Sequence, residues 1–146
     1  MTDYQHILLA VDFGSNIEQV LARTTDLVER YQAHLTLLHV VENMPISDAG
    51  YGPIIPFEFD LTEQLTAAAR QRMEQLGQTP GLENAQTRIE SGSPKVEIIR
   101  VAEEIGADLI IVGSHGRHGL ALLLGSTASG VIHHAKCDVL AVRLSS

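Results

Sequence analysis

The chain has 146 residues, 45% of them hydrophobic, which is enough apolar material for the core of one domain over residues 1–146. The formal net charge of −8, with ten scattered Lys and Arg residues, argues against a nucleic-acid or anionic-membrane surface. The single cysteine, Cys137, excludes an internal disulfide and favours a reducing, cytoplasmic location. The first apolar run is too short for a signal peptide or a membrane span.

The first half of the chain predicts two strands and two helices. Residues 7–11 form a continuous apolar run that ends at Asp12, as expected of a strand buried on both faces. Residues 17–31 repeat apolar side chains every three or four positions, which predicts an amphipathic helix. Residues 35–41 predict a second strand. The prolines and glycines of 44–56 predict a long irregular loop, from Glu42 to Phe59, before a second helix from about 60 to 77.

The second half repeats the alternation. Residues 85–90 are short and polar, which favours an edge strand, and Ser91-Gly-Ser-Pro94 is typical of a helix start. The third helix is expected to end at Gly106. Residues 109–112 predict a strand buried on both faces, Gly125-Ser126-Thr127 opens a fourth periodic stretch, and residues 137–144 predict a closing strand.

Five strands that alternate with helices predict an α/β fold, a three-layer sandwich around a mainly parallel sheet. Right-handed crossovers restrict the topology, and the commonest small solution has the strand order 3-2-1-4-5. In that order the winding reverses between strands 1 and 4. The carboxyl ends there carry Asp12 and Gly113, and strand 2 brings Val41 alongside. We therefore expect ligand binding at this edge of the sheet.

A glycine loop follows the fourth strand at this same edge. Gly113, Gly116 and Gly119 recur at three-residue spacing, and such a loop lets a ligand approach the backbone closely. The helix start at Ser126 and Thr127 adds free amides and hydroxyls, which attract phosphate. The alternative is that the glycines only allow a tight turn and that Ser126 or Thr127 is only an N-cap, because the string fits neither GxGxxG nor GxxxxGK[ST].

The chain resembles the universal stress protein family, of the UspA type, from end to end. The matching pieces are Ile7-Leu-Leu-Ala-Val-Asp12, His39-Val-Val41, Gly92-Ser-Pro94, Ala107-Asp-Leu-Ile-Ile-Val-Gly-Ser-His-Gly116, Gly125-Ser-Thr127 and Cys137-Asp-Val-Leu-Ala-Val142. The resemblance implies an adenine-nucleotide-hydrolase-like, Rossmann-like sandwich. It also implies a cytoplasmic homodimer that is induced by starvation and other stress.

One branch of this family binds ATP through G-x2-G-x9-G-[ST], whereas another, which includes UspA, lacks these glycines and does not bind nucleotide. Here Gly113-x2-Gly116 is followed by only eight residues before Gly125-Ser126, one fewer than the pattern. The shorter loop is either absorbed or turns the helix start by about 100°. We expect binding to be retained, because every chemically useful group of the motif is present.

The resemblance implies a role for each matched position. Asp12 would accept hydrogen bonds from a ribose hydroxyl or help to hold a metal, since a carboxylate repels naked phosphate. The Val41 backbone would face the adenine edge. The glycine loop would wrap the ribose and phosphates, and the helix start would donate to the terminal phosphates with Mg²⁺ sharing the charge. The residues concerned are Asp12, Val41, Gly113, Ser114, His115, Gly116, Arg117, Gly125, Ser126 and Thr127.

Two other chemistries are weaker. His133, His134 and Cys137 invite a metal interpretation, but structural zinc needs four ligands, so we expect no metal site and assign the histidines to the charge of a helix C-terminus. A triad of Ser114, His115 and Asp12 lacks the Gly-x-Ser-x-Gly elbow. Hydrolysis would therefore be at most a slow ATPase activity, driven by positioning and charge neutralisation.

The last strand, from Val139 to Leu144, predicts an interface. A bare apolar edge strand risks aggregation, and pairing with the same strand of a second copy removes that risk. We therefore expect a homodimer, in agreement with the resemblance. The leading hypothesis is an ATP-binding sensor or adaptor with no robust turnover. The alternatives are a UspA-like dimer that acts only through protein partners and a slow ATP hydrolase.

Overall fold

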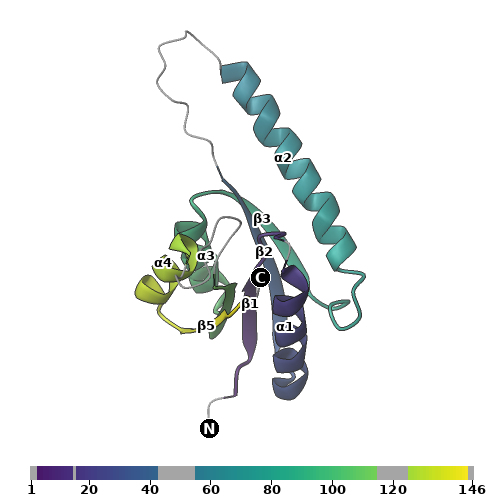
Figure 1. Ribbon diagram of the computed structural model, residues 1–146, viewed down its shortest axis with the longest axis vertical. Helices are drawn as coiled ribbons and strands as arrows, with labels where there is room; N and C mark the ends of the chain where they lie inside the picture. Colours follow the sequence, from purple (N-terminus) through teal and green to yellow (C-terminus); the bar gives the residue numbers. More distant parts are fainter. Residues whose placement is uncertain (1–2, 15, 43–54, 115–124, 145–146) are drawn as a thin grey trace.

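A computed structural model describes residues 3–14, 16–42, 55–114 and 125–144, with the side chains of residues 55–60 left out. Its elements alternate from strand to helix along the chain, as the ribbon in Figure 1 shows. They are β1 (His6–Ala10), α1 (Ile17–Tyr31), β2 (His34–Glu42), α2 (Ile55–Leu76), β3 (Gln86–Gly92), α3 (Pro94–Ile105), β4 (Leu109–Gly113), α4 (Ser126–His134) and β5 (Asp138–Val142).

The five strands form one parallel sheet in the order β3-β2-β1-β4-β5, which confirms the predicted topology. β1 lies at the centre. It pairs with β2 on one side, in the register Ala10 to Leu38, and with β4 on the other, in the register Leu9 to Ile111. The continuous apolar runs of β1 and β4 thus follow from burial on both faces of the sheet.

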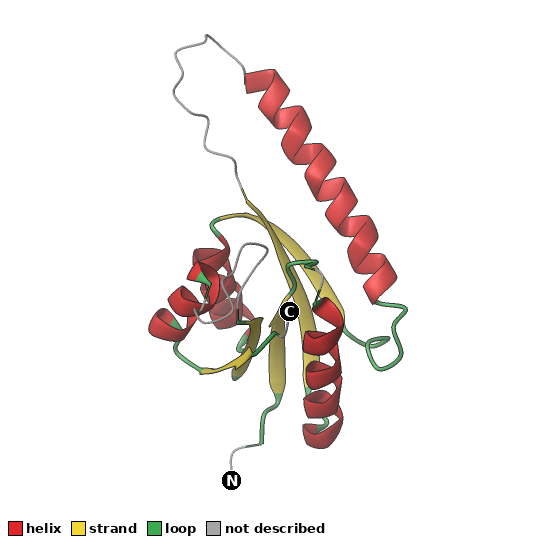
Figure 2. Cartoon of the chain, viewed as in Figure 1, coloured by secondary structure: helices red, strands yellow, loops and turns green. Residues whose placement is uncertain are grey.

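Helices cover both faces of the sheet, which gives the expected three layers (Figure 2). Alternate residues of each strand face opposite helix pairs. Ile7, Leu9 and Ile111 pack with residues of α1 and α2, whereas Leu8 and Ile110 pack with residues of α3 and α4. No helix in the described ranges is long and apolar enough to cross a membrane.

Most strand boundaries differ from the sequence prediction by one or two residues, and the start of α2 differs by about five. α2 begins at Ile55, so residues 55–59, expected in the long loop, are helical. Pro56 is compatible with this because the first turn of a helix needs no backbone N–H donor. β3 runs to Gly92, two residues beyond the predicted strand, because its pairing with β2 continues to Glu42. Residues 43–54 of the predicted loop lie outside the described part.

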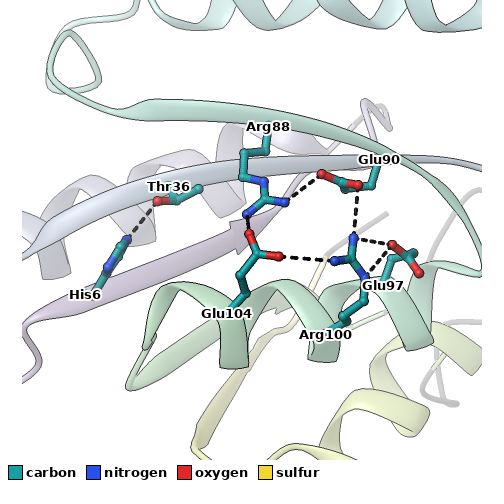
Figure 3. Close-up of polar contacts among 7 residues, drawn as sticks. All are labelled: His6, Thr36, Arg88, Glu90, Glu97, Arg100 and Glu104. Carbon is teal, nitrogen blue, oxygen red and sulfur yellow. Dashed lines mark hydrogen bonds and ion pairs between the residues drawn. The ribbon is translucent and has the colours of Figure 1, made fainter.

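Charged side chains fasten the edge strand β3 to α3 (Figure 3). Arg88 of β3 pairs with Glu90 at 2.8 Å and with Glu104 of α3, and Arg100 pairs with Glu90 at 3.0 Å and with Glu97 at 2.7 Å. A network of this kind is stronger than isolated surface pairs, which contribute about 0 to 1 kcal/mol each. It also places charge beside an edge strand, which discourages pairing with other chains.

Polar contacts organise the amino end of the sheet, opposite the predicted site. The Asp108 carboxylate accepts the backbone N–H groups of Gln5 at 2.9 Å and His6 at 3.0 Å. The His6 ring lies 2.8 Å, Nε2 to Oγ1, from the hydroxyl of Thr36, whose residue is 1% exposed (Figure 3). Burial lowers the pKa of His6, the neighbouring His34 lowers it further, and Asp108 opposes both effects. The folded chain therefore favours neutral His6.

This lowered pKa predicts a loss of stability in acid. Above about pH 6.5 His6 is neutral in both states, and below it the unfolded chain takes up the proton more readily, so the free energy of unfolding falls as the pH drops. Between about pH 7.5 and 5, we expect the free energy of unfolding, measured with urea, to fall less in His6→Gln than in the wild-type protein. The exposed His133, replaced by Gln, is the control. An unchanged pH profile in His6→Gln would contradict the assignment.

Candidate functional site

The carboxyl ends of β1 and β4 meet where the winding of the sheet reverses. Beyond the last residue of β1, the Val11 N–H still donates to the Leu38 carbonyl at 2.7 Å, so the chain stays beside β2 up to Asp12. From there it turns to α1 on one face, while the chain leaving β4 leads to α4 on the other. Divergent connections of this kind open a crevice at the edge of a parallel sheet.

Backbone hydrogen bonds bring the start of α4 back to the end of β4. The Ser114 N–H donates to the Val142 carbonyl of β5 at 2.8 Å, and the Ser114 carbonyl accepts the Gly125 N–H at 2.7 Å. The Ser114 hydroxyl accepts the Leu144 N–H at 3.2 Å. Ser114 thus joins β4, β5 and the start of α4, and it closes the base of the predicted glycine loop.

α4 begins beside this junction, with Gly125 as its N-cap. Gly125 has extended backbone angles, φ −65° and ψ 160°, and its carbonyl accepts the Ser129 N–H at 2.9 Å. Ser126 and Thr127 are the first two helical residues, so the alternative that one of them is the N-cap is wrong. The first amides of a helix have no partner within the helix and attract anions. The oxygens of a phosphate, which accept hydrogen bonds, match this arrangement of N–H donors.

Asp12 lies in a turn that follows β1. Its Oδ1 accepts the Gly14 N–H at 2.8 Å, a hydrogen bond across two residues that is typical of an aspartate turn. A Cβ on Gly14 would lie 3.1 Å from the same Oδ1, so the turn favours glycine. Between them, Phe13 has the left-handed φ of 58°, which costs a residue with a side chain about 1 to 2 kcal/mol.

Three aromatic or charged side chains hold this turn, and the sequence analysis did not identify them as part of the site. The Phe13 ring contacts the ring of His39, at 4.6 Å between centroids, and the Arg72 guanidinium, at 4.5 Å from the centroid. His39 Nδ1 also donates to the Val11 carbonyl at 2.7 Å. Arg72 Nη2 lies 3.5 Å from the Phe13 carbonyl. No local sequence pattern connects α2 with this turn.

The other predicted residues are distributed as follows. Gly113 ends β4 opposite Val142. Val41 lies in β2 opposite Ser91 of β3. The Leu38 carbonyl faces β1, and successive residues of a strand direct their backbone groups to opposite neighbours. The backbone of Val40 is therefore directed to the β1 side, and that of Val41 to β3. His115, Gly116 and Arg117 lie outside the described residues.

The end of α4 carries the histidines considered as metal ligands. His133 and His134 are exposed in its last turn. Burial raises the pKa of the Cys137 thiol, and Asp138 and Asp108 raise it further. Within the ranges that can be described, no three His, Cys, Asp or Glu side chains are grouped so as to hold a metal ion.

Comparisons with known proteins point to one family. The Universal stress protein family matches residues 3–143. Universal stress protein A homolog 2 of Coxiella burnetii is 39% identical over 145 residues, which are 99% of this chain and 98% of that protein. Universal stress protein UspA from Lactobacillus plantarum superposes with a TM-score of 0.83 at 31% identity, covering 98% of this chain and 100% of that one.

A more distant structural neighbour contains a nucleotide. It is a universal stress protein in complex with cAMP, with a TM-score of 0.62 and 23% identity, covering 99% of this chain and 100% of that one. At this identity the similarity shows the shared fold. The match covers 98 to 100% of the length of each of these three proteins, so it concerns the whole domain.

The left-handed turn predicts an unusual order of stability for two variants. Glycine usually destabilises a structure by about 0.5 to 1 kcal/mol relative to alanine. At position 13 we expect the reverse, with Phe13→Gly more stable than Phe13→Ala by about 1 kcal/mol, because only glycine adopts this φ without strain. Urea unfolding of both variants measures the difference. A Phe13→Ala variant as stable as Phe13→Gly would contradict the strained backbone.

Proposed function

Because this chain belongs to the universal stress protein family, we propose that it binds ATP with Mg²⁺ at the carboxyl ends of β1 and β4 and acts as a stress-response sensor or adaptor. The observation that carries the proposal is the Gly125 to Ser114 hydrogen bond, which holds the start of α4 at the end of β4. In the proposed site, the free amides of this helix start face the nucleotide at the edge of the sheet where the winding reverses. The cAMP-bound neighbour supports the proposal at the level of the fold.

Each part of the nucleotide has a proposed partner. The terminal phosphates accept hydrogen bonds from Ser126 and Thr127 at the start of α4, and Mg²⁺ offsets their charge. Asp12 accepts a ribose hydroxyl or helps to hold the metal. The adenine edge lies against the end of β2 at Val41, and the backbone of the neighbouring Val40, which is directed to the β1 side, supplies the hydrogen-bonding groups. Gly113 and Ser114 contact the ribose and phosphates, and the family resemblance adds His115, Gly116 and Arg117, which lie outside the described residues.

Two alternative functions differ from this proposal. In the first, the protein binds no nucleotide and acts only through protein partners. In the second, the bound ATP is hydrolysed slowly. Ser126 and Thr127 begin α4, where amides without a partner in the helix attract phosphate, and this supports binding over the first alternative. The proposed location is the cytoplasm, and the single cysteine of the chain is its support.

A substitution at the helix start tests the nucleotide site. We expect nucleotide-stripped protein to bind Mg²⁺-ATP with a micromolar Kd, about −8 kcal/mol. Gly125→Val should weaken the affinity for Mg²⁺-ATP at least about tenfold, a loss of about 1.4 kcal/mol, because the branched side chain blocks close approach of phosphate. The φ of −65° at Gly125 is allowed for any residue, so backbone strain does not explain a loss. Isothermal titration calorimetry measures both affinities.

Gly77→Ala, after the end of α2, is the control, because a Cβ there makes ordinary contacts. Wild-type affinity in Gly125→Val would place the phosphates elsewhere. An absence of binding heat in the wild-type protein would favour the alternative that acts through protein partners. Release of inorganic phosphate during the titration would favour the slow hydrolase.

We also propose that β5 pairs with β5 of a second copy to form a homodimer. β5 is an edge strand that pairs with β4 on one side. The Val142 carbonyl and the Leu144 N–H both bond to Ser114 on the β4 side, so the alternating backbone of Ala141 faces the open edge. An isologous contact through this edge satisfies its outward backbone groups and covers the apolar strand.

The direction of the Ala141 backbone provides a selective test. Proline at 141 removes an outward N–H and leaves the hydrogen bonds to β4 intact, a position that edge strands tolerate. We expect Ala141→Pro to be a folded monomer and wild-type protein to be a dimer in light scattering coupled to gel filtration. Ala141→Val, which keeps the N–H, should remain dimeric. A dimeric Ala141→Pro variant would rule out pairing through β5.

A further inference from the structure

The turn after β1 depends on a side chain from a distant part of the chain. Arg72 belongs to α2, whose position is fixed by the next residue, Met73, which is 2% exposed in the core between α2 and the sheet. From there the Arg72 guanidinium reaches the Phe13 ring at 4.5 Å. A cation over an aromatic ring at an exposed site contributes about 0.5 to 1 kcal/mol. Arg72 thus contributes to holding Phe13 in place.

Phe13 in turn determines the hydrogen bond of Asp12. Its left-handed φ of 58° turns the chain so that the Gly14 N–H reaches Asp12 Oδ1 at 2.8 Å. Left-handed backbone is strained for phenylalanine and persists only where its surroundings hold it. The groups in contact with the Phe13 ring are the ring of His39 and the guanidinium of Arg72.

The geometry points to Arg72 as a positioning residue that orients Asp12 toward the nucleotide through the backbone of Phe13. This inference rests on the proposed function and deepens it, since it assigns to α2 a part in the affinity of the site. Arg72 acts through the turn, and its contact is with Phe13, on the ring and near the carbonyl. The site is thereby coupled to the position of α2, the helix that follows residues 43–54.

The first measurement is the affinity for Mg²⁺-ATP by calorimetry. We expect Arg72→Gln to weaken binding about fivefold, which corresponds to about 1 kcal/mol, the upper end for an exposed cation–π contact. Arg72→Lys, which keeps a cation, should recover part of the loss. Arg70→Gln on the same helix is the matched control, because Arg70 is exposed and carries the same charge. An equal loss in Arg70→Gln would overturn the inference in favour of a general charge effect.

A double-mutant cycle separates positioning from direct contact with the ligand. In a Phe13→Gly background the turn is adopted without strain, so Arg72→Gln should change the affinity less than about twofold. The same fivefold loss in both backgrounds would overturn the inference, because Arg72 would then act on the nucleotide itself.

A measurement without nucleotide keeps this inference distinguishable from the proposed function. In the wild-type protein, the hydrogen bond to Asp12 should slow the exchange of the Gly14 amide hydrogen with solvent, and Asp12→Ala should speed it. We expect Arg72→Gln to speed this exchange and Arg70→Gln to leave it unchanged. Unchanged exchange in Arg72→Gln would overturn the inference even if ATP binds. An absence of ATP binding in the wild type would overturn the proposed function, and the Gly14 exchange rate would still decide whether Arg72 orients Asp12.

Discussion

The parallel pairing of β1 with β4 is the constraint on which the rest of the molecule depends. The two strands are far apart in the sequence, yet Leu8 pairs with Ile110 at the centre of the sheet, and both side chains are fully buried. Right-handed crossovers on either side then carry α1 and α3 to opposite faces. The same pairing therefore builds the core and separates the two connections that form the candidate site.

The sequence predicts this framework well because burial on both faces leaves a clear signal. The continuous apolar runs of β1 and β4 admit few other structures, and the handedness of crossovers then leaves few strand orders. The start of α2 is harder to predict. Pro56 and the glycines before it resemble loop composition, although a proline in the first helical turn disrupts no hydrogen bond. The length of β3 is likewise set by its pairing partner rather than by its own polar residues.

Some residues of the candidate site can likewise be predicted from the sequence, and others cannot. Glycines and hydroxyls near β4 and α4 could be found from their spacing, because that pattern reflects the needs of the backbone at a helix start. The contacts of Phe13 with His39 and Arg72 join three separate elements, and no spacing within one element encodes them. A left-handed residue is also expected to be glycine or asparagine. The neighbouring Gly14 would have been the natural choice, whereas the structure assigns that φ to Phe13.

Electrostatics gives the orientation of Asp12 its importance. A chain with a net charge of −8 repels a nucleotide at long range, so the proposed binding requires local donors such as the amides at the start of α4. A carboxylate within the same site repels bare phosphate, yet it favours binding when it accepts a ribose hydroxyl or ligates Mg²⁺. Which of these effects dominates depends on where the second carboxylate oxygen points once Gly14 holds the first. In the proposed site, the backbone angle of Phe13 therefore sets whether Asp12 favours or opposes the nucleotide.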